Sequence, residues 1–367
     1  MEKVTYKNVH NRFKLNGVHL DKQDLCSLSY ALIKEGDVFE KSIGDFLLDW
    51  FDQKPYIDLQ TSGTTGVPKL IRMNKQNMVN SALATGDFFE LSPGDKALYC
   101  LPTRYIAGKM MLIRSFILGL EIDFVAPSSH PLDKNTKVYD FVAMVPLQAQ
   151  NSLKALKNVK KMIVGGAKMS KTLEKSLLKV PTSVYETYGM TETITHIAAK
   201  KIGEKAFSIL PNITISQNEK KCLVIDAPKI TDEHIVTNDL VELINDHQFV
   251  FLGRIDNVVN SGGIKLIPEQ IEEQLSAHIA ARFFVGGIAD ADLGEKLVLV
   301  IEGEKTALSE QLFDGLDKYQ KPKAVYYISK FVETDNGKIK RREMLNTVSQ
   351  NGCFVMGNYI HDANSYF

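Results

Sequence analysis

The sequence has few cysteines and no excess of charge of either sign. Its four cysteines, at positions 26, 100, 222 and 353, form no C-x-x-C pair, which excludes zinc-ribbon and thioredoxin-like sites. Lysine plus arginine and aspartate plus glutamate each number 44, so the formal net charge is zero and no nucleic-acid-binding surface is indicated. Cys100 and Cys222 stand in apolar runs and are expected to be buried thiols of a reducing compartment.

Long apolar runs are absent as well. The longest candidate, around residues 141–153, contains proline and glutamine and is too short to span a bilayer. The N-terminal residues 1–5 begin no apolar signal segment. We therefore expect a cytoplasmic protein with neither a membrane nor a nucleic acid as partner. Whether it forms a homo-oligomer stays open.

What the sequence does contain is an alternation of β-rich runs and helical patterns. The expected strands are residues 96–101, 140–145 and 160–164, and the expected helices are residues 74–89 and 170–179. Such alternation predicts an α/β fold with mostly parallel sheets and flanking helices. In such sheets ligands gather where the C-terminal ends of strands meet loops.

A change of character near residue 257 predicts two domains. Before it, residues 240–244 and 249–252 are expected to form a hairpin around a turn-rich spacer. After it comes a compact set of expected elements: a helix over 269–279, strands over 282–285 and 297–301, and a helix over 308–316. We predict a large N-terminal domain, residues 1–256, and a small mobile α+β domain, residues 257–367, which ends in a polar tail.

The loop Thr61–Lys69 combines hydroxyl groups, two glycines and a cation. The residues that would contribute are Thr61, Ser62, Gly63, Thr64, Thr65, Gly66 and Lys69. Glycine backbone with positive φ lets successive N–H groups point into one concavity, which suits a triphosphate. The spacing is not that of a Walker A loop. Composition alone favours phosphate binding only slightly over a polar surface turn.

Together with a second motif, this loop resembles the phosphate loop of the acyl-adenylate-forming superfamily. The second motif is the Tyr-Gly-x-Thr-Glu sequence of Tyr188, Gly189, Thr191 and Glu192; alone it would be interpreted as a capped helix start. The resemblance implies that Tyr188 stacks on adenine, Thr191 bonds a phosphate oxygen and Glu192 holds a magnesium ion.

Three further motifs follow in the order of that family. Gly165, Gly166 and Ala167 resemble its adenine-side turn. Asp239 matches the acidic residue that binds the ribose hydroxyls, and Arg254 would contact ribose or phosphate oxygens; alone, each would be a surface residue. Lys338 matches the C-terminal lysine that reaches the active site during adenylation, where an ammonium stabilises two converging anions.

The resemblance covers residues 61–341 and has one gap. Only sixty residues precede the phosphate loop, whereas family members typically carry a much longer segment. We expect an N-terminal domain that is shortened but retains the nucleotide site.

Within the superfamily, residues 253–272 look closest to o-succinylbenzoate–CoA ligases of menaquinone biosynthesis. That resemblance implies ATP, magnesium and coenzyme A as partners of a small carboxylic acid. It also implies a hinge at Asn257, where asparagine tolerates unusual backbone angles. The CoA thiol would enter past Ser261, Gly262 and Gly263.

The acid of that branch carries two carboxylates, so a cation is expected near the unreactive one. The segment 101–108 resembles the acyl-pocket segment of the family, and the candidates are Arg104, Tyr105, Lys109, Arg114 and His196. Two structural alternatives stay open: Arg114 could be a snorkelling arginine on a surface helix, and His196 could be a satisfied interior histidine.

The function implied by the resemblance is formation of an acyl-adenylate followed by an acyl-CoA thioester. Three alternatives stay open. The acid could be another aryl or short-chain acid, the acceptor could be a carrier protein, or the chain could bind nucleotide without catalysis. Pyrophosphate and thioester assays with and without CoA would distinguish them.

Overall fold

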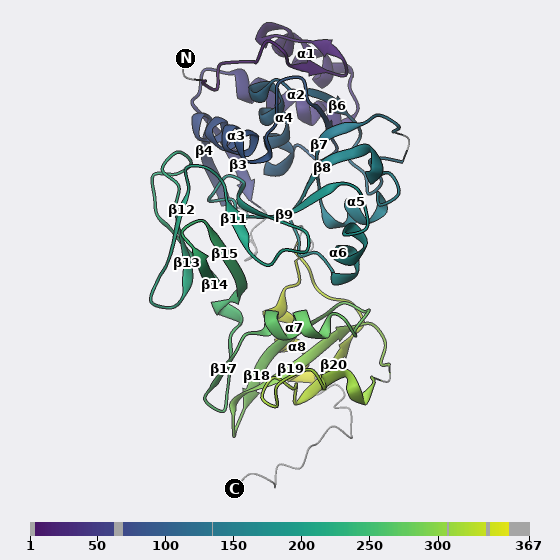
Figure 1. Ribbon diagram of the computed structural model, residues 1–367, viewed down its shortest axis with the longest axis vertical. Coiled ribbons are helices and arrows are strands. Elements are labelled where there is room, and N and C mark those ends of the chain that lie inside the picture. The colour runs from purple at the N-terminus through teal and green to yellow at the C-terminus, as the bar shows by residue number, and fades with distance from the viewer. Residues whose placement is uncertain (1–3, 62–68, 134, 307, 335–337, 352–367) are drawn as a thin grey trace.

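The computed structural model describes residues 4–61, 69–133, 135–306, 308–334 and 338–351 (Figure 1). Figure 1 shows two parts, one above the other, and each has a sheet of its own. The upper sheet ends with the strand that finishes at Arg254, and a short 3-10 helix, η2 (Ile255–Asn257), leads to the lower sheet. We propose the division at residue 256 and call the parts the large and the small domain.

One half of the large sheet is parallel. Its strands lie in the order β9-β8-β7-β5-β6-β1, and each runs parallel to its neighbour. Their bounds are β9 (Ser183–Gly189), β8 (Val159–Val164), β7 (Tyr139–Met144), β5 (Lys96–Tyr99), β6 (Glu121–Phe124) and β1 (Lys14–Leu15), with β2 (Val18–His19) antiparallel at the edge. The predicted α/β fold and its three predicted strands are confirmed. The strands β5, β7 and β8 are rich in apolar residues and largely buried.

The other half of the same sheet is antiparallel, which the alternation of strands and helices did not predict. It continues from β9 in the order β10-β11-β15-β14-β13-β12. The bounds are β10 (His196–Lys201), β11 (Phe207–Ile209), β12 (Thr214–Gln217), β13 (Cys222–Asp226), β14 (Ile235–Asn245) and β15 (Gln248–Arg254). The predicted hairpin around residues 245–248 is confirmed as β14 and β15, both longer than expected.

The helices of the large domain cover the parallel half of its sheet. They are α1 (Lys22–Glu35), α2 (Val38–Phe51), α3 (Lys75–Phe89), α4 (Ile106–Leu118), α5 (Pro146–Asn151), η1 (Leu156–Asn158) and α6 (Lys171–Leu177). Local sequence sets where they begin: Asp21, Asn74 and Ser170 cap α1, α3 and α6 with their side chains. Trp50 of α2 is fully buried, with its ring 5.6 Å from that of Phe116 in α4.

A separate two-stranded sheet carries the phosphate-loop segment. β3 (Tyr56–Thr61) and β4 (Lys69–Asn74) are antiparallel, and Thr61 and Lys69 are direct partners. The predicted phosphate-binding residues Ser62, Gly63, Thr64, Thr65 and Gly66 lie outside the described residues.

The small domain packs three helical segments on a sheet of five strands. Its elements are β16 (Val259–Ser261), β17 (Ile264–Leu266), α7 (Pro268–Leu275), β18 (Phe283–Asp290), β19 (Gly294–Glu302), η3 (Glu310–Phe313), β20 (Ala324–Ile328) and α8 (Arg341–Asn351). The predicted helix over 308–316 is wrong: only the 3-10 helix η3 forms, because Asp314 and Gly315 leave too few residues for an α-helical ladder.

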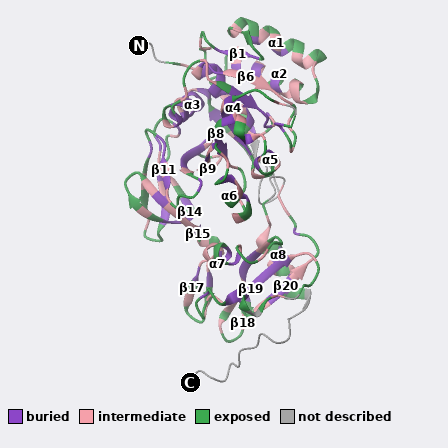
Figure 2. Cartoon of the chain, turned by 45° about the vertical axis from the view of Figure 1, so that its right-hand side comes forward, coloured by how far each residue is buried: buried purple, intermediate pink, exposed green. Residues whose placement is uncertain are grey.

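Each domain has a buried centre of its own. In Figure 2 buried residues run along the strands of both sheets, and the apolar clusters around Val285 and Phe284 share no member with those of the large domain. The expected burial of Cys100 and Cys222 is confirmed. In the part of the chain that the structure describes, no helix has the length and apolar character needed to cross a membrane.

Candidate active site

The predicted adenine-side turn follows β8 directly. Gly166 has a φ of +87°, which favours glycine. A Cβ on Gly165 would lie 2.4 Å from Oγ1 of Thr187 in the neighbouring strand β9. That hydroxyl donates to the carbonyl of Val164 at 3.2 Å. The turn is therefore held tightly against β9, at the C-terminal edge of the parallel strands where a ligand is expected.

Tyr188 and Gly189 end strand β9, so the interpretation of this motif as a helix start is wrong. A Cβ on Gly189 would lie 2.3 Å from the carbonyl oxygen of Thr195, which makes glycine necessary here. The ring of Tyr188 packs against Phe207 and Phe249 of the antiparallel half, with centroid distances of 5.8 and 5.2 Å. The aromatic cluster positions the phenol at the C-terminal end of β9.

The phenol of Tyr188 donates a hydrogen bond of 2.5 Å to Oδ2 of Asp239. Asp239 is buried in β14, and its Oδ1 accepts from Nη1 of Arg254 at 3.2 Å. Burial first, and then the carboxylate of Asp239, raises the pKa of Tyr188, so the phenol stays protonated. Three predicted nucleotide contacts thus form one polar unit, with a carboxylate that accepts from donors on both oxygens.

Arg254 is the cross-strand partner of Asp239 and also binds Asp256, through Nη2 at 2.9 Å. Burial lowers the pKa of Arg254, but the carboxylates of Asp256 and Asp239 outweigh it and the pKa is raised overall. Asn238, which stands where the family usually has glycine, donates to Asp256 at 3.1 Å. The substitution therefore adds a contact and leaves Asp239 in place.

Thr191 and Glu192 lie in the turn between β9 and β10. The carbonyl of Thr191 accepts from the N–H of Ile194 at 2.9 Å, and the buried hydroxyl of Thr193 donates to the carbonyl of Thr195 at 2.7 Å. Ile194 has a φ of +66°, a left-handed conformation that costs a β-branched residue roughly 1–3 kcal/mol. Such strain is typical of functional turns. The exposed Glu192 lies in this turn, at the C-terminal end of β9.

Arg114 and His196 come together in the interior, beneath this turn. Arg114 of α4 is 2% exposed, so the interpretation as a surface arginine is wrong. Its Nη2 lies 3.3 Å from Oγ1 of Thr195 and 3.5 Å from Nδ1 of His196. The other ring nitrogen of His196 lies 3.3 Å from the hydroxyl of Thr85. Because the guanidinium can only donate, Nδ1 is the acceptor and the proton sits on Nε2.

The electrostatics of this pair are those of a buried cation without an anion. Among the described residues Arg114 forms no salt bridge, and its Nε has no hydrogen-bond partner. Burial lowers the pKa of Arg114 to about 9, which still leaves it charged at neutral pH. Burial, and then the charge of Arg114, lowers the pKa of His196 well below its usual range. The interior therefore holds a fixed positive charge beside a neutral imidazole.

The other predicted acid-pocket residues lie on α4 or just before it. Tyr105 caps the helix, and the exposed Arg104 stacks over its ring at 4.8 Å. Lys109 lies 5.0 Å over the ring of Phe46 in α2, and burial lowers its pKa. Five residues along a helix correspond to about 140°, so Lys109 and Arg114 point in different directions. The structure groups Arg114 with His196 and does not add Lys109 to them.

The small domain carries the remaining predicted residues. Lys338 is exposed, and its backbone is fixed by Thr334: its N–H donates to Oγ1 at 3.2 Å and its carbonyl accepts at 2.9 Å. The side-chain amide of Asn257 donates to Glu269 at 2.5 Å.

Gly262 and Gly263 follow Ser261 in the two-residue turn of the hairpin β16–β17. Their φ values are +58° and +82°. A hairpin turn of this type requires positive φ at both central residues. The turn therefore explains why glycine stands at both positions, independently of the predicted path for a thiol.

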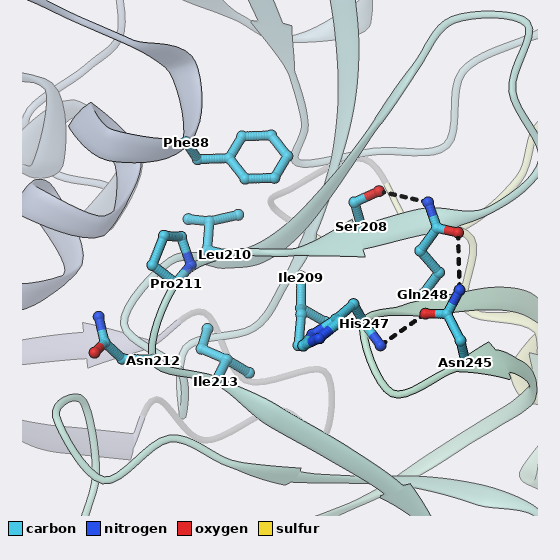
Figure 3. A pocket seen from close by; sticks show the side chains of 10 residues that line it. All are labelled: Phe88, Ser208, Ile209, Leu210, Pro211, Asn212, Ile213, Asn245, His247 and Gln248. Atoms are coloured by element: carbon cyan, nitrogen blue, oxygen red, sulfur yellow. Dashed lines mark hydrogen bonds between the residues drawn. The ribbon is translucent and has the colours of Figure 1, made fainter.

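A surface pocket of about 450 Å³ lies away from all of these residues. Figure 3 shows Phe88, Leu210 and Pro211 along one side of it and hydrogen-bonded polar side chains along the other. Gln248 donates to Ser208 at 3.0 Å and accepts from Asn245 at 3.3 Å. None of the predicted site residues lines this pocket.

Known proteins resemble this chain in sequence and in fold. The family described as AMP-binding enzyme matches residues 54–226. An acyl-CoA synthetase (AMP-forming)/AMP-acid ligase II-like protein from Dyadobacter fermentans is 33% identical, with a TM-score of 0.60, and the match covers 88% of this chain and 98% of that one. A 2-succinylbenzoate–CoA ligase from Salmonella typhimurium is 26% identical over 361 residues, 89% of this chain and 78% of the relative.

A further solved structure has the same fold. The o-succinylbenzoate coenzyme A synthetase from Bacillus subtilis, in complex with ATP and a magnesium ion, is 20% identical, with a TM-score of 0.68. The match covers 78% of this chain and 69% of that one.

Proposed function

Because this chain belongs to the AMP-binding enzyme family, we propose that it is an AMP-forming acid–CoA ligase whose acid carries a second carboxylate, as 2-succinylbenzoate does. The observation that carries the choice of acid is the buried cation of Arg114, which has no anionic partner among the described residues. The curated relative from Salmonella typhimurium carries the name of that ligase. The proposed reaction has two steps, adenylation and thioester formation.

The second carboxylate of the acid would complete the environment of Arg114. Burying a charge without a partner has a large desolvation free energy, which a bound ligand of opposite charge offsets. The guanidinium can bind a carboxylate with two parallel hydrogen bonds. The imidazole ring of His196 is neutral, with its Nε2–H directed at the hydroxyl of Thr85. It therefore adds no second positive charge beside Arg114.

The nucleotide would lie along the ends of β8, β9 and β14. Tyr188 would support the adenine ring, Gly165–Ala167 would line its edge, and Asp239 would accept from the ribose hydroxyls. The two bonds that Asp239 already accepts show that its oxygens are good acceptors in this setting. We propose the loop Thr61–Lys69 as the triphosphate cradle.

The residues at the turn fit a magnesium ion that is shared with phosphate. Among the described residues no three histidine, cysteine, aspartate or glutamate side chains gather in one place. Magnesium is commonly held by one or two carboxylates together with substrate phosphates and water, and the exposed Glu192, beside Thr191, supplies one such carboxylate. When bound, the ion would neutralise phosphate charge.

In the first step the activated carboxylate of the acid attacks the α-phosphorus of ATP, and pyrophosphate leaves. Two anions approach each other, so a cation that contacts both lowers the barrier electrostatically. We propose Lys338 for this role, because it is exposed on the small domain and matches the lysine that reaches the active site in the family it resembles. In the second step the thiol of CoA attacks the mixed anhydride, and AMP leaves.

The experiment that tests the function measures pyrophosphate and thioester across a panel of acids. The panel pairs 2-succinylbenzoate with 4-oxo-4-phenylbutanoate, which lacks only the ring carboxylate. We expect pyrophosphate release and a CoA thioester with the first acid, and kcat/KM at least about 100-fold lower with the second, as for loss of a charged hydrogen-bonded pair. Equal activity with both acids would contradict the role of Arg114. Pyrophosphate without thioester would contradict CoA as acceptor.

A further inference from the structure

The carboxylate of Glu272 connects the element that follows Lys338 to the rest of the small domain. Glu272 lies in α7, and its side chain is 6% exposed. Its Oε1 accepts from the N–H of Val285 at 3.0 Å and lies 2.7 Å from Nη1 of Arg341. Its Oε2 accepts from Nη2 of Arg341 at 2.9 Å. Because Arg341 stands three residues after Lys338, this ion pair, with its one hydrogen bond from Nη2, anchors the end of the lysine segment to α7.

The large domain reaches the same carboxylate. Nζ of Lys168 lies 3.6 Å from Oε2 of Glu272, and Nζ of Lys171 lies 2.7 Å from the neighbouring Glu273. Lys168 precedes α6 and Lys171 is its first residue, and α6 lies next to the small domain in Figure 1. Lys168 directly follows Ala167, the last residue of the adenine-side turn. One ion pair therefore joins that turn to the anchor of the lysine segment.

The carboxylates of Glu269 and Glu272 carry more negative charge than Arg341 alone balances. Glu269 and Glu272 both approach Arg341, which lies 3.8 Å from Glu269 and 2.7 Å from Glu272. Two nearly buried carboxylates thus share one guanidinium. The ammonium of Lys168 supplies the second positive charge, so moving the domains apart would leave a carboxylate under-compensated.

The contact is also close sterically at the boundary between the domains. A Cβ on Gly253, in the last strand of the large sheet, would lie 2.5 Å from Oε2 of Glu269. Glu269 in turn holds the side chain of Asn257 at 2.5 Å. The hinge, α7 and Arg341 are therefore one connected set, and Lys168 is its contact on the other side.

We propose that Lys168 is a positioning residue: through Glu272 and Arg341 it couples the adenine-side turn to the segment that carries Lys338. The proposal rests on the proposed function for the role of Lys338. Lys168 touches no reacting atom. It raises the fraction of molecules in which the two domains are docked as observed, and Lys171 with Glu273 supports it.

The size of the effect follows from exposure. The side chain of Lys168 is 65% exposed, and an exposed ion pair shifts a two-state equilibrium by up to about fivefold. We therefore expect the equilibrium constant for docking to fall by roughly two- to fivefold on losing Lys168. A purely local surface pair would leave the docked fraction unchanged.

The first test measures domain docking without catalysis. Spin labels at positions 154 and 265, introduced by Lys154→Cys and Lys265→Cys with Cys26 and Cys353 changed to serine, report the distance between the domains. We expect Lys168→Met to lower the ratio of molecules at the observed distance to molecules at other distances by roughly two- to fivefold. The control is Lys160→Met, whose partner Asp140 lies within the large domain at 2.6 Å. Equal distance distributions in both variants and the parent would overturn the proposal.

The second test separates the two steps of the proposed reaction. We expect Lys168→Met to lower kcat of adenylation by roughly two- to fivefold, with KM for the acid and thioester formation from presynthesised acyl-adenylate unchanged. The charge exchange Lys171→Glu with Glu273→Lys should restore docking that Lys171→Glu alone lowers. An equal loss in both steps would overturn the proposal. If no acid releases pyrophosphate, the proposed function fails while the label distances still decide the role of Lys168.

Discussion

Arg114 directs its guanidinium at the imidazole of His196, with 3.5 Å between Nη2 and Nδ1. Both groups are buried, and one of them must therefore be neutral. The guanidinium is the stronger base, so the imidazole gives up its charge, as the direction of its pKa shift indicates. A single fixed cation is left in the interior, available to an anionic ligand.

Replacing Arg114 by methionine should separate stability from activity. Because methionine fits a buried site without charge, we expect Arg114→Met to raise the free energy of unfolding by about 1 kcal/mol or more. The same variant should lose about 100-fold or more in kcat/KM for 2-succinylbenzoate and much less for 4-oxo-4-phenylbutanoate. Urea unfolding and the pyrophosphate assay measure the two effects.

Arg72 provides the matched control for this variant. It is exposed and pairs with Asp58 at 2.9 Å in the two-stranded sheet. Arg72→Met should change neither quantity by more than about 1 kcal/mol or its kinetic equivalent. If Arg114→Met destabilised the protein and lowered activity equally for both acids, Arg114 would be a structural residue.

The pH dependence of stability should reveal the neutral His196. Its pKa in the folded protein lies well below the value of about 6.5 in an unfolded chain. Below pH 6.5 the unfolded state therefore binds one proton more, and stability falls as pH decreases. Between pH 7 and pH 5 we expect the parent to lose more stability than His196→Gln does. Urea unfolding at several pH values tests this, and parallel curves would contradict it.

The positions of several site residues could be predicted from the sequence, because their motifs lie at the ends of predicted strands. The pattern before Gly165 predicts a buried strand, and β8 indeed ends at Val164. The place of Tyr188 was harder to predict, since a Tyr-Gly-x-Thr-Glu segment has local features of a helix start. Its strand character comes from pairing with β8 and β10, which are contacts distant in sequence.

Burial of charged side chains was the least predictable feature. The periodicity of α4 allows Arg114 either an inner or an outer face, and only packing against α3 and β10 decides between them. The partners of Lys168 and Glu272 are equally invisible in sequence, because they meet across a domain boundary. Local pattern predicts elements well and contacts between elements poorly.

Asp239 should determine nucleotide affinity. Asp239→Asn keeps the size of the side chain but removes the charge that holds Tyr188 and Arg254. Charged hydrogen bonds contribute about 1.5–3 kcal/mol, so we expect the Kd for ATP to rise by about tenfold or more. Asp256→Asn is the control, since Asp256 is exposed and binds the same Arg254; its effect should stay within about twofold. Calorimetric titration with ATP measures both, and similar effects would contradict the assignment.

Gly189 should tolerate no side chain. A Cβ there would meet the carbonyl oxygen of Thr195 at 2.3 Å and Cα of His196 at 2.5 Å, and both are backbone atoms that cannot turn aside. We expect Gly189→Ala to lower the free energy of unfolding by about 1–3 kcal/mol through overpacking. Gly315→Ala is the control, because a Cβ at Gly315 meets nothing within 4 Å. Thermal unfolding compares the two, and equal midpoints would mean that β10 shifts at no cost.

Lys338 should serve one of the two proposed steps and not the other. Its ammonium would stabilise the anions that converge when the carboxylate attacks the α-phosphorus, and no such pair forms when a thiol attacks the mixed anhydride. Removing one such donor costs about 10²–10³ in rate. We expect Lys338→Ala to slow adenylation by that factor and to leave thioester formation from presynthesised acyl-adenylate within about threefold of the parent.

Lys340 offers the matched control for Lys338. It lies two residues further along and pairs with Glu343 at 3.7 Å, within the small domain. Lys340→Ala should change neither step by more than about threefold. Single-turnover measurements of both steps compare the variants. A loss of equal size in both steps for Lys338→Ala would mean that the lysine supports folding or docking of the small domain, because the converging anions that it is proposed to stabilise form only in the first step.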